Sequence, residues 1–429
     1  MRYPEKLLMM IWQCRMYNAK ALRCETGEYL HIISPGSVNR DAGPDFLQAK
    51  IQMDGIAWFG HIEIHWDAAD WYAHGHQSDV NYDGVILHVV WQGDDVIKRT
   101  DGTIIPSLQL QKIVDPQILP HYQQLMESLT WIPCASRLPH VPNHISRQVL
   151  DRLLPDRLME KVEMVFKMLS DYQGDWERTV RVWMAQTFGM RVNKHAFLRL
   201  LESFPNALID RYKHRKTSLE ALLFGQSGLL PSTPTDSYTQ CLRSEYNYLK
   251  KLHRLTPMDA QEWKFLRMRP SNFPTIRIAQ LAALFHHTPN LCSLIVEAEN
   301  FKNVEVVFSN VEVSDYWTNQ VRFGKIGNIN SRFFSKNFMY HLIINSFVVI
   351  AYAYGHYHGT EALQHRAVKW LEKLPPENNN LVRKFSKHGL DVLHAGDTQA
   401  LLYLHARYCS SKQCMSCSIG YFVMNNRGN

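Results

Sequence analysis

The spacing of apolar positions along this chain changes near residue 130. Before that point, short apolar runs with a period of two predict β-strands. From residue 143 onward, apolar residues recur every three or four positions, which predicts amphipathic helices. We therefore expect an α+β protein with an N-terminal α/β domain over residues 1–135 and a mostly α-helical C-terminal domain over residues 136–429.

The first 110 residues predict a definite order of elements. A helix is expected over residues 4–16, then strands over 28–34, 45–53 and 57–66, a short helix over 67–76, and strands over 85–91 and 103–110. Asp54-Gly55 lies between the second and third strands and predicts a tight hairpin turn. The strand over 85–91 is apolar throughout, as expected for a buried strand.

The helical half includes a long periodic segment over residues 147–172, with Pro155 as a candidate kink. Its most apolar window, 338–354, contains His341 and Asn345 and is too short for a clean membrane span, so a buried helix is expected. Residues 301–330 are expected to hold a short strand or an irregular crossover. Because the N-terminal apolar run is too short for a secretory signal, we expect a cytoplasmic protein with no membrane segment.

Charge adds little to this picture. The net charge of +7 over 429 residues is mild, so it permits a nucleic-acid partner without requiring one and leaves the oligomeric state open.

Candidate chemistry is concentrated between Gly43 and Val90, where five histidines and seven acidic residues lie among the predicted strands. Alternation along a strand places Glu63 and His65 on one face. Asp45 begins the preceding strand, and neighbouring strands lie about 5 Å apart, so one register brings Asp45 beside Glu63. Two such carboxylates suit Mg²⁺ or Mn²⁺, which would polarise a phosphate and activate water. A polar, solvent-facing side of the sheet is the simpler alternative.

This pattern resembles the PD-(D/E)XK nuclease superfamily over about 90 residues. The shared features are the order helix, three strands, helix, strand, together with Pro44-Asp45 and Glu63-Ile64. The resemblance implies a restriction-endonuclease-like core, phosphodiester hydrolysis, metal binding by Asp45 and Glu63, and a helix carboxylate supplied by Glu5. His65 stands where the superfamily has lysine, which puts activity in doubt. Lys50 is a displaced candidate, on the opposite strand face unless a bulge intervenes.

A second ligand set lies at His74, His76 and Asp79. Histidines with a carboxylate suit Zn²⁺ or Mn²⁺, so a His/carboxylate metalloenzyme unrelated to nucleases is an alternative. His88, on a strand, is expected in the core.

The C-terminal cysteines Cys409, Cys414 and Cys417 have the spacing of a metal knuckle. A fourth ligand would come from His405 nearby or from the distant Cys134. The set resembles the iron–sulfur cysteines of RecB-like exonucleases, which implies a bound cluster, while zinc is the other metal that such thiolates favour. Three unliganded cysteines remain the alternative.

Nearly the whole chain is similar to an uncharacterised bacterial family, a domain of unknown function. The segments that carry this similarity are GPDF, GHIEIH, DWYAHGH, YDGVILHVVW, WIPC, RPSNFPTIRIAQLA and YCSSKQCMSC. The family supplies no activity. The leading hypothesis is a metal-dependent nuclease with Asp45, Glu63 and His65 as its catalytic residues. The alternatives are a non-catalytic nucleic-acid-binding or scaffold protein that kept the fold, or the unrelated metalloenzyme.

Overall fold

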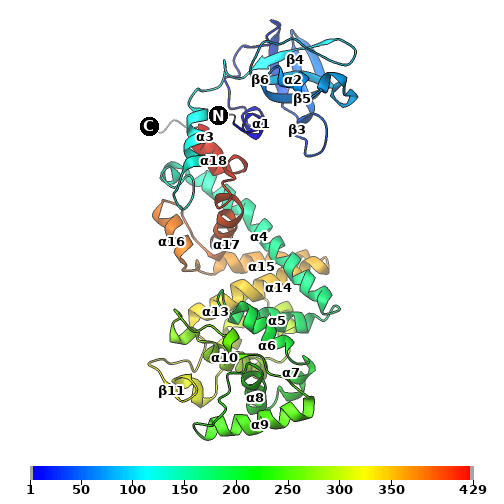
Figure 1. Cartoon of the computed structure of the whole chain (residues 1–429). Coiled ribbons are helices and arrows are strands. Elements are labelled where there is room, and N and C mark those ends of the chain that lie inside the picture. Colours follow the sequence, from blue (N-terminus) through cyan, green and yellow to red (C-terminus); the bar gives the residue numbers. More distant parts are fainter. Residues whose placement is uncertain (1–2, 426–429) are drawn as a thin grey trace. The chain divides into compact units, whose positions relative to one another are not determined.

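The computed structural model describes residues 3–425 and divides the chain into two compact units (Figure 1). Unit 1 comprises residues 1–149, 385–390 and 404–429, and unit 2 comprises residues 150–384 and 391–403. The α+β class and the helical C-terminal half are confirmed. The boundary between residues 135 and 136 stays a prediction.

Unit 1 carries the sheet. Its elements are α1 (Glu5–Gln13), β1 (Leu22–Arg23), β2 (Tyr29–Ser34), β3 (Ser37–Val38), β4 (Phe46–Met53), β5 (Ile56–Asp67), α2 (Asp70–Ala73), β6 (Val85–Gln92), β7 (Ile97–Lys98), β8 (Ile104–Ile105), β9 (Ser107–Gln109), α3 (Ile118–Glu127) and α18 (Ser418–Asn425). The expected strand over 103–110 is two short strands, β8 and β9. The expected helix over 67–76 is shorter and continues as a 3₁₀ turn, His76–Ser78.

The seven-stranded sheet has the order β1-β2-β4-β5-β6-β9, with β3 paired to β4. Strands β2, β4 and β5 run antiparallel, whereas β6 runs parallel to β5 and β9 runs parallel to β6. The parallel step requires a crossover, which α2 and two 3₁₀ turns provide. The β4–β5 turn uses Asp54 (φ 44°) and Gly55 (φ 85°), the left-handed pair of a type I′ hairpin.

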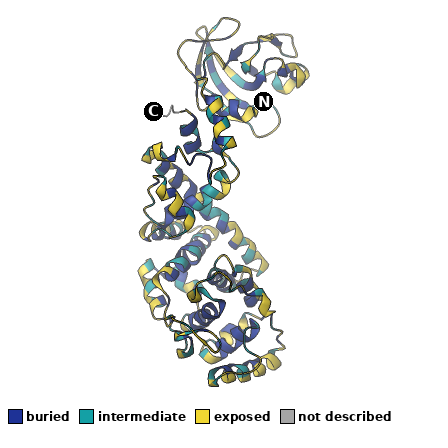
Figure 2. Ribbon diagram, turned by 60° about the vertical axis from the view of Figure 1, so that its left-hand side comes forward, coloured by how far each residue is buried: buried dark blue, intermediate teal, exposed yellow. Residues whose placement is uncertain are grey.

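Helix α1 covers part of one sheet face and contacts β5. Leu7, Leu8 and Ile11 on α1 and Ile62 on β5 are almost fully buried. Burial of each such side chain stabilises the fold by about 1.5–3 kcal/mol. Figure 2 shows that buried positions dominate the central strands of the sheet. The opposite face of β5 is therefore the one that presents Glu63 and His65.

Unit 2 is helical. Its elements are α4 (Asn143–Asp171, which begins in unit 1), α5 (Trp176–Phe188), α6 (Lys194–Glu202), α7 (Ala207–Tyr212), α8 (Lys216–Gln226), α9 (Ser237–His253), α10 (Pro274–His287), α11 (Leu291–Glu297), α12 (Phe301–Ser309), β10 (Gln320–Arg322), β11 (Lys325–Ile326), α13 (Lys336–Leu342), α14 (Val348–Tyr357), α15 (Glu361–Lys373), α16 (Asn380–Lys387, which ends in unit 1) and α17 (Ala395–Leu404). The short strands β10 and β11 lie within residues 301–330, where a short strand or an irregular crossover was expected, and residues 301–309 form a helix. Pro155 lies inside α4, as predicted.

Helices α13 and α14 join through a π-helical turn, Ile343–Phe347, into one run over Lys336–Tyr357. Among the described residues, this is the one helix long and apolar enough to cross a membrane, and 72% of its apolar window is buried inside the protein. The expected buried helix is confirmed. The cytoplasmic location stays a prediction.

Candidate metal centre

Asp45 and Glu63 face each other across the β4–β5 pair. The pairing of Phe46 with Ile62 sets this register. The Asp45 amide donates to Glu63 Oε2 (3.0 Å), and the Ile64 amide donates to Asp45 Oδ2 (3.1 Å). The structure thus brings the two predicted carboxylates together. It also fixes Glu63 so that one oxygen is held by the backbone, while Oε1 is left for the neighbouring histidines.

Lys50 does not join these carboxylates. A β-bulge interrupts β4 between Phe46 and Ala49, with Gln48 at φ 56°. A bulge adds one residue to the strand, so Lys50 returns to the face of Asp45. Its Nζ nevertheless lies over the Phe59 ring, 4.8 Å from the centroid, several residues along the strand from Glu63. Lys50 therefore shares the face of the site without supplying its missing lysine.

Three histidines gather at Glu63. His65 lies on β5, His74 ends α2, and His76 begins the next turn after Gly75, whose φ of 79° reverses the chain between them. One ring nitrogen from each histidine lies within 4.8 Å of the other two. Helix α2 and the turn at Gly75 together therefore place the imidazoles of His74 and His76 over strand β5.

Three of the separations among these atoms are close to those of a tetrahedral ligand set, whereas the group whose ligand atoms all lie within 4.8 Å of one another comprises the three histidines without Glu63. Metal–ligand bonds of about 2.0–2.1 Å in a tetrahedron separate neighbouring ligand atoms by about 3.3 Å. Glu63 Oε1 lies 3.5 Å from His65 Nε2 and 3.3 Å from His76 Nε2. His65 Nε2 lies 3.1 Å from His74 Nδ1. Glu63, His65, His74 and His76 are hereafter the Glu-His site.

A buried ring nitrogen that lacks a hydrogen-bond partner also suits this site to a cation. His76 is buried, and its Nε2 has no hydrogen-bond partner despite lying near Glu63. A buried polar atom without a partner costs roughly 1–3 kcal/mol. A divalent cation bound by the Glu-His site would satisfy this atom. His74, by contrast, is exposed, so the site is open to solvent on that side.

His88 supports the cluster from the core, where the sequence predicted it. It is fully buried on β6, and its Nε2 lies 2.8 Å from His65 Nδ1. Burial, followed by the neighbouring imidazoles, lowers the pKa of His88 well below its ordinary value, so the ring is neutral. Neutral His88 can accept the Nδ1 proton of His65, which leaves the His65 Nε2 lone pair facing Glu63. Such a partner fixes both tautomer and orientation of a metal-binding histidine.

Aromatic rings hold the remaining side of the site. Tyr82 stacks on His76 with centroids 3.8 Å apart, and Trp71 meets the edges of His76 and His88. Trp71 also anchors a buried apolar cluster with Val85 and residues of the β7–β8 hairpin. The imidazole of His76 is therefore positioned by packing as well as by polar contacts.

The pKa of Asp45 is strongly raised by its surroundings. Burial first, and then the neighbouring Glu63 carboxylate, raise the pKa of Asp45 to about 7, while the Ile64 hydrogen bond and the more distant Glu5 act in opposite directions. The predicted proximity of Glu5 is thus visible as an electrostatic effect. Without a cation nearby, Asp45 retains a proton near neutral pH. A bound cation would displace that proton.

Asp79 lies apart from the Glu-His site. Its carboxylate accepts from the backbone and side-chain nitrogens of Asn81, both at 2.9 Å, and caps a 3₁₀ turn, Val80–Tyr82. The structure therefore gives Asp79 a local role in the turn. The cysteines predicted as ligands form a separate group in unit 1, with Cys134 in the turn after α3 and the others just before α18.

One buried polar network in unit 2 was not predicted. The Lys161 ammonium donates to Asn345 Oδ1 (3.1 Å) and Gln399 Oε1 (2.8 Å), and Asn345 and Gln399 both donate to Glu377. Burial lowers the pKa of Lys161 to about 7. The only sequence signal was the pair of polar residues, His341 and Asn345, inside the most apolar helix. The π-helical turn frees the Asn345 carbonyl, which accepts from Trp183 Nε1 (2.8 Å).

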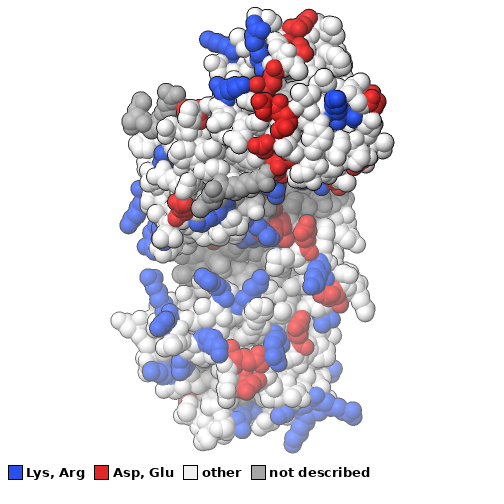
Figure 3. All heavy atoms as spheres, turned by 45° about the horizontal axis from the view of Figure 1, so that its top comes forward, with Lys and Arg blue, Asp and Glu red and all other residues white. Residues whose placement is uncertain are grey.

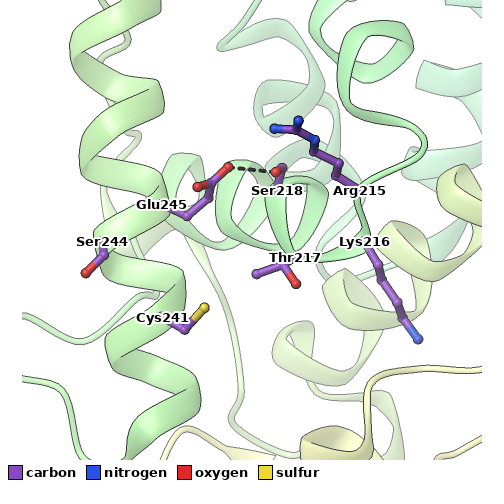
Figure 4. A pocket seen from close by; sticks show the side chains of 7 residues that line it. All are labelled: Arg215, Lys216, Thr217, Ser218, Cys241, Ser244 and Glu245. Atoms are coloured by element: carbon purple, nitrogen blue, oxygen red, sulfur yellow. Dashed lines mark hydrogen bonds between the residues drawn. The ribbon is translucent and has the colours of Figure 1, made fainter.

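A polar pocket of about 620 Å³ opens in unit 2 between α8 and α9 (Figure 4). Arg215 and Lys216 line one side and Cys241 and Glu245 the other, with Glu245 bonded to Ser218. The Arg181 guanidinium is buried and donates to Asp210 Oδ1 (2.7 Å). Figure 3 shows basic and acidic side chains interspersed over the face drawn, as expected for a mild net charge.

The comparisons identify a family. The model of the family described as "Protein of unknown function (DUF2851)" matches residues 5–380. The chain belongs to this family. The matched range includes the Glu-His site and most of unit 2, and ends before the three C-terminal cysteines. Neither curated proteins nor solved structures gave a match. The predicted resemblance to an uncharacterised family is confirmed, and the resemblance to nucleases stays a prediction.

Proposed function

We propose that unit 1 is a metal-dependent phosphodiesterase, and that the Glu-His site binds its divalent cation. The observation that carries this proposal is the gathering of one ring nitrogen each from His65, His74 and His76 within 4.8 Å of one another, with Glu63 Oε1 3.5 Å from His65 Nε2 and 3.3 Å from His76 Nε2. Three imidazoles and one carboxylate favour Zn²⁺ or Mn²⁺ over Mg²⁺, which prefers oxygen ligands. When bound, such an ion polarises a phosphoryl oxygen and lowers the pKa of water.

The chain's own residues would do the rest. Asp45, held by the Ile64 amide beside Glu63, would accept a proton from the attacking water, because a bound cation displaces its own proton and leaves the carboxylate ionised. His88 holds the orientation of His65. The balanced reaction consumes one water and one phosphodiester and yields a phosphomonoester and an alcohol.

The same sheet face supports a nucleic acid as substrate. Alternation along β5 places Phe59 on the face of Glu63, four residues away, or roughly 13 Å at about 3.3 Å per residue. Phe59 is 69% exposed, and the ammonium of Lys50 lies over its ring. An exposed ring beside a cation can stack a base and attract the phosphate backbone. This interpretation gives Lys50 a substrate-binding role in place of the catalytic one.

The test is an assay of the purified full chain with Zn²⁺ or Mn²⁺ on single-stranded DNA, double-stranded DNA and RNA, accompanied by metal analysis. We expect Glu63→Gln and His76→Ala to lose both the bound metal and the activity. His31→Ala, which alters an exposed histidine on β2, should retain both. Phe59→Ala should raise KM with little change in kcat, because it touches binding alone.

A second function, a His/carboxylate metalloenzyme acting on another substrate, is favoured by the three histidines around one glutamate. It predicts metal loss in His76→Ala without phosphodiesterase activity in the wild type. If metal content is the same in wild type and both site variants and no substrate is cleaved, both proposals fail and a binding or scaffold role remains.

A further inference from the structure

Four of the eight cysteines lie on two segments of unit 1 that pack against each other. They are Cys134, Cys409, Cys414 and Cys417, hereafter the cysteine group. Cys134 lies in a tight turn, where its carbonyl accepts from the amides of Arg137 and Leu138. The other three belong to a short knuckle that ends where α18 begins.

Several contacts hold these two segments together, although more than 270 residues separate them in the chain. Arg137 donates to the Val423 carbonyl (3.1 Å), and Lys412 donates to the Ser128 carbonyl (3.2 Å). Helix α18 packs on α3, as Figure 1 shows, and the His121 ring contacts the Met424 carbonyl at 3.1 Å. The turn that carries Cys134 is therefore held beside the segment that carries the other three cysteines by the fold, not by proximity in the chain.

The knuckle itself is closely packed. A Cβ on Gly420, in the first turns of α18, would lie 2.1 Å from the Cys414 carbonyl oxygen. Cys417 donates its amide to the same carbonyl at 3.2 Å. A larger residue at 420 would push the knuckle away from α18.

The thiols are poor candidates for nucleophiles. Burial first, and then the neighbouring thiols of the group, raise the pKa of Cys134 to about 12, and the pKa of Cys409 is raised by the same causes. In Cys414 burial again dominates, with Cys417 adding to it and Lys412 opposing it. Reactive cysteines need a lowered pKa.

The fourth ligand is also resolved by the fold. The sequence left His405 and Cys134 as alternatives. The His405 ring lies parallel to Trp131 at 6.4 Å, and its Nδ1 lies 3.4 Å from Ser410 Oγ. Cys134, by contrast, lies in the chain between Ser128 and Arg137, whose contacts with Lys412 and Val423 hold the C-terminal segment beside it. The structure favours a set of four sulfurs.

We propose that the cysteine group is a four-thiolate metal centre that fastens the C-terminal knuckle to the turn after α3. Four cysteines in a closed arrangement bind zinc structurally or hold an iron–sulfur cluster. Binding of Zn²⁺ replaces up to four thiol protons and forms four Zn–S bonds, with no change in oxidation state. The centre is independent of the Glu-His site, so either proposal can fail alone.

The first test is metal analysis of the full chain, with visible absorption. We expect about one zinc bound at the cysteine group of each chain; iron with acid-labile sulfide and absorbance near about 400 nm would identify a cluster on the same ligands. Cys134→Ser and Cys417→Ser should lose this metal. Cys24→Ser, a matched change at a buried cysteine outside the group, and His76→Ala should retain it. Equal content in Cys134→Ser and wild type would overturn the proposal.

A second test needs no variant and therefore does not depend on folding. Native wild-type protein is alkylated with and without a chelator, and the labelled cysteines are mapped by mass spectrometry. Cys14 and Cys241 are exposed and should be labelled in both samples. The cysteine group should be labelled only after chelation. Disulfides within the group, or labelling that the chelator does not change, would refute the metal centre.

Discussion

Replacement of Asp45 by asparagine should stabilise the metal-free protein at alkaline pH while it weakens the site. The wild-type carboxyl keeps its proton up to pH about 7 in the folded state, whereas an unfolded aspartate releases it near 3.8. Between these values the folded state binds more protons than the unfolded chain, so stability falls as pH rises. Asparagine removes this loss, and its carbonyl oxygen can still accept from the Ile64 amide.

The magnitude follows from the shift. A difference of about three pKa units at 1.36 kcal/mol each gives an upper bound of ~4 kcal/mol at pH 8 and ~1 kcal/mol at pH 4.5. Because Glu63 shares the proton with Asp45, we expect a gain nearer ~2 kcal/mol at pH 8. In a unit of this size, that is a rise in Tm of roughly 4–8 °C.

The assay is thermal unfolding in EDTA at pH 4.5 and pH 8, with Asp41→Asn, a change at an exposed loop carboxylate, as the control. Addition of Zn²⁺ or Mn²⁺ should then raise the Tm of the wild type more than that of Asp45→Asn, since a bound ligand stabilises in proportion to its affinity. A gain of equal size at both pH values would refute the electrostatic reasoning, as would the absence of any gain at pH 8.

Other changes test the remaining structural interpretations. Lys161→Met removes a buried amine whose pKa is lowered to about 7. The unfolded lysine stays charged up to about 10.5, so the unfolded chain binds more protons than the folded protein between pH 7 and 10. The free energy of unfolding of the wild type, relative to that of the variant, should therefore rise over this pH range in urea unfolding. Trp183→Phe should cost about 1–3 kcal/mol in the same assay, because it leaves the Asn345 carbonyl in the π-helical turn without its donor. Gly60→Ala should lower Tm by several degrees, because its Cβ would lie 2.5 Å from the Gly84 carbonyl oxygen and separate β5 from β6; an unchanged Tm would show that β6 shifts freely.

Local patterns predicted the sheet well because each strand's signal lies within a few residues. The alternation around Glu63 and the Asp54-Gly55 turn were sufficient to place Asp45 opposite Glu63. The position of Lys50 was not predictable in the same way, since a bulge at Gln48 changes its face and no sequence signal marks that bulge. The first part of the segment 301–330, residues 301–309, is a helix that was not predicted, although the short strands expected in that segment are present. Its β-branched valines favour a strand, yet its apolar side chains Val304 and Phe308 have helical spacing and are buried.

The candidate site was predicted in parts. The sequence supplied the residue types, but it could not show that the His74-Gly75-His76 turn folds back onto Glu63, because that depends on the crossover between two parallel strands. It gave Asp79 equal weight with His74 and His76, whereas the structure uses Asp79 to cap a turn. The network around Lys161 escaped prediction because its members come from helices far apart in the chain.

The closure of unit 1 by the last described helix has a consequence for biosynthesis. Helix α18 packs on α3, and the contact between His121 and Met424 spans 303 residues. All of unit 2 lies between these two positions in the chain. On the ribosome the sheet can therefore form early. The packing of unit 1 cannot be completed, and the surface of α3 stays uncovered, until nearly the entire chain has been translated. Premature termination close to the end would leave this surface open for association with other chains, although every strand of the sheet would already be present.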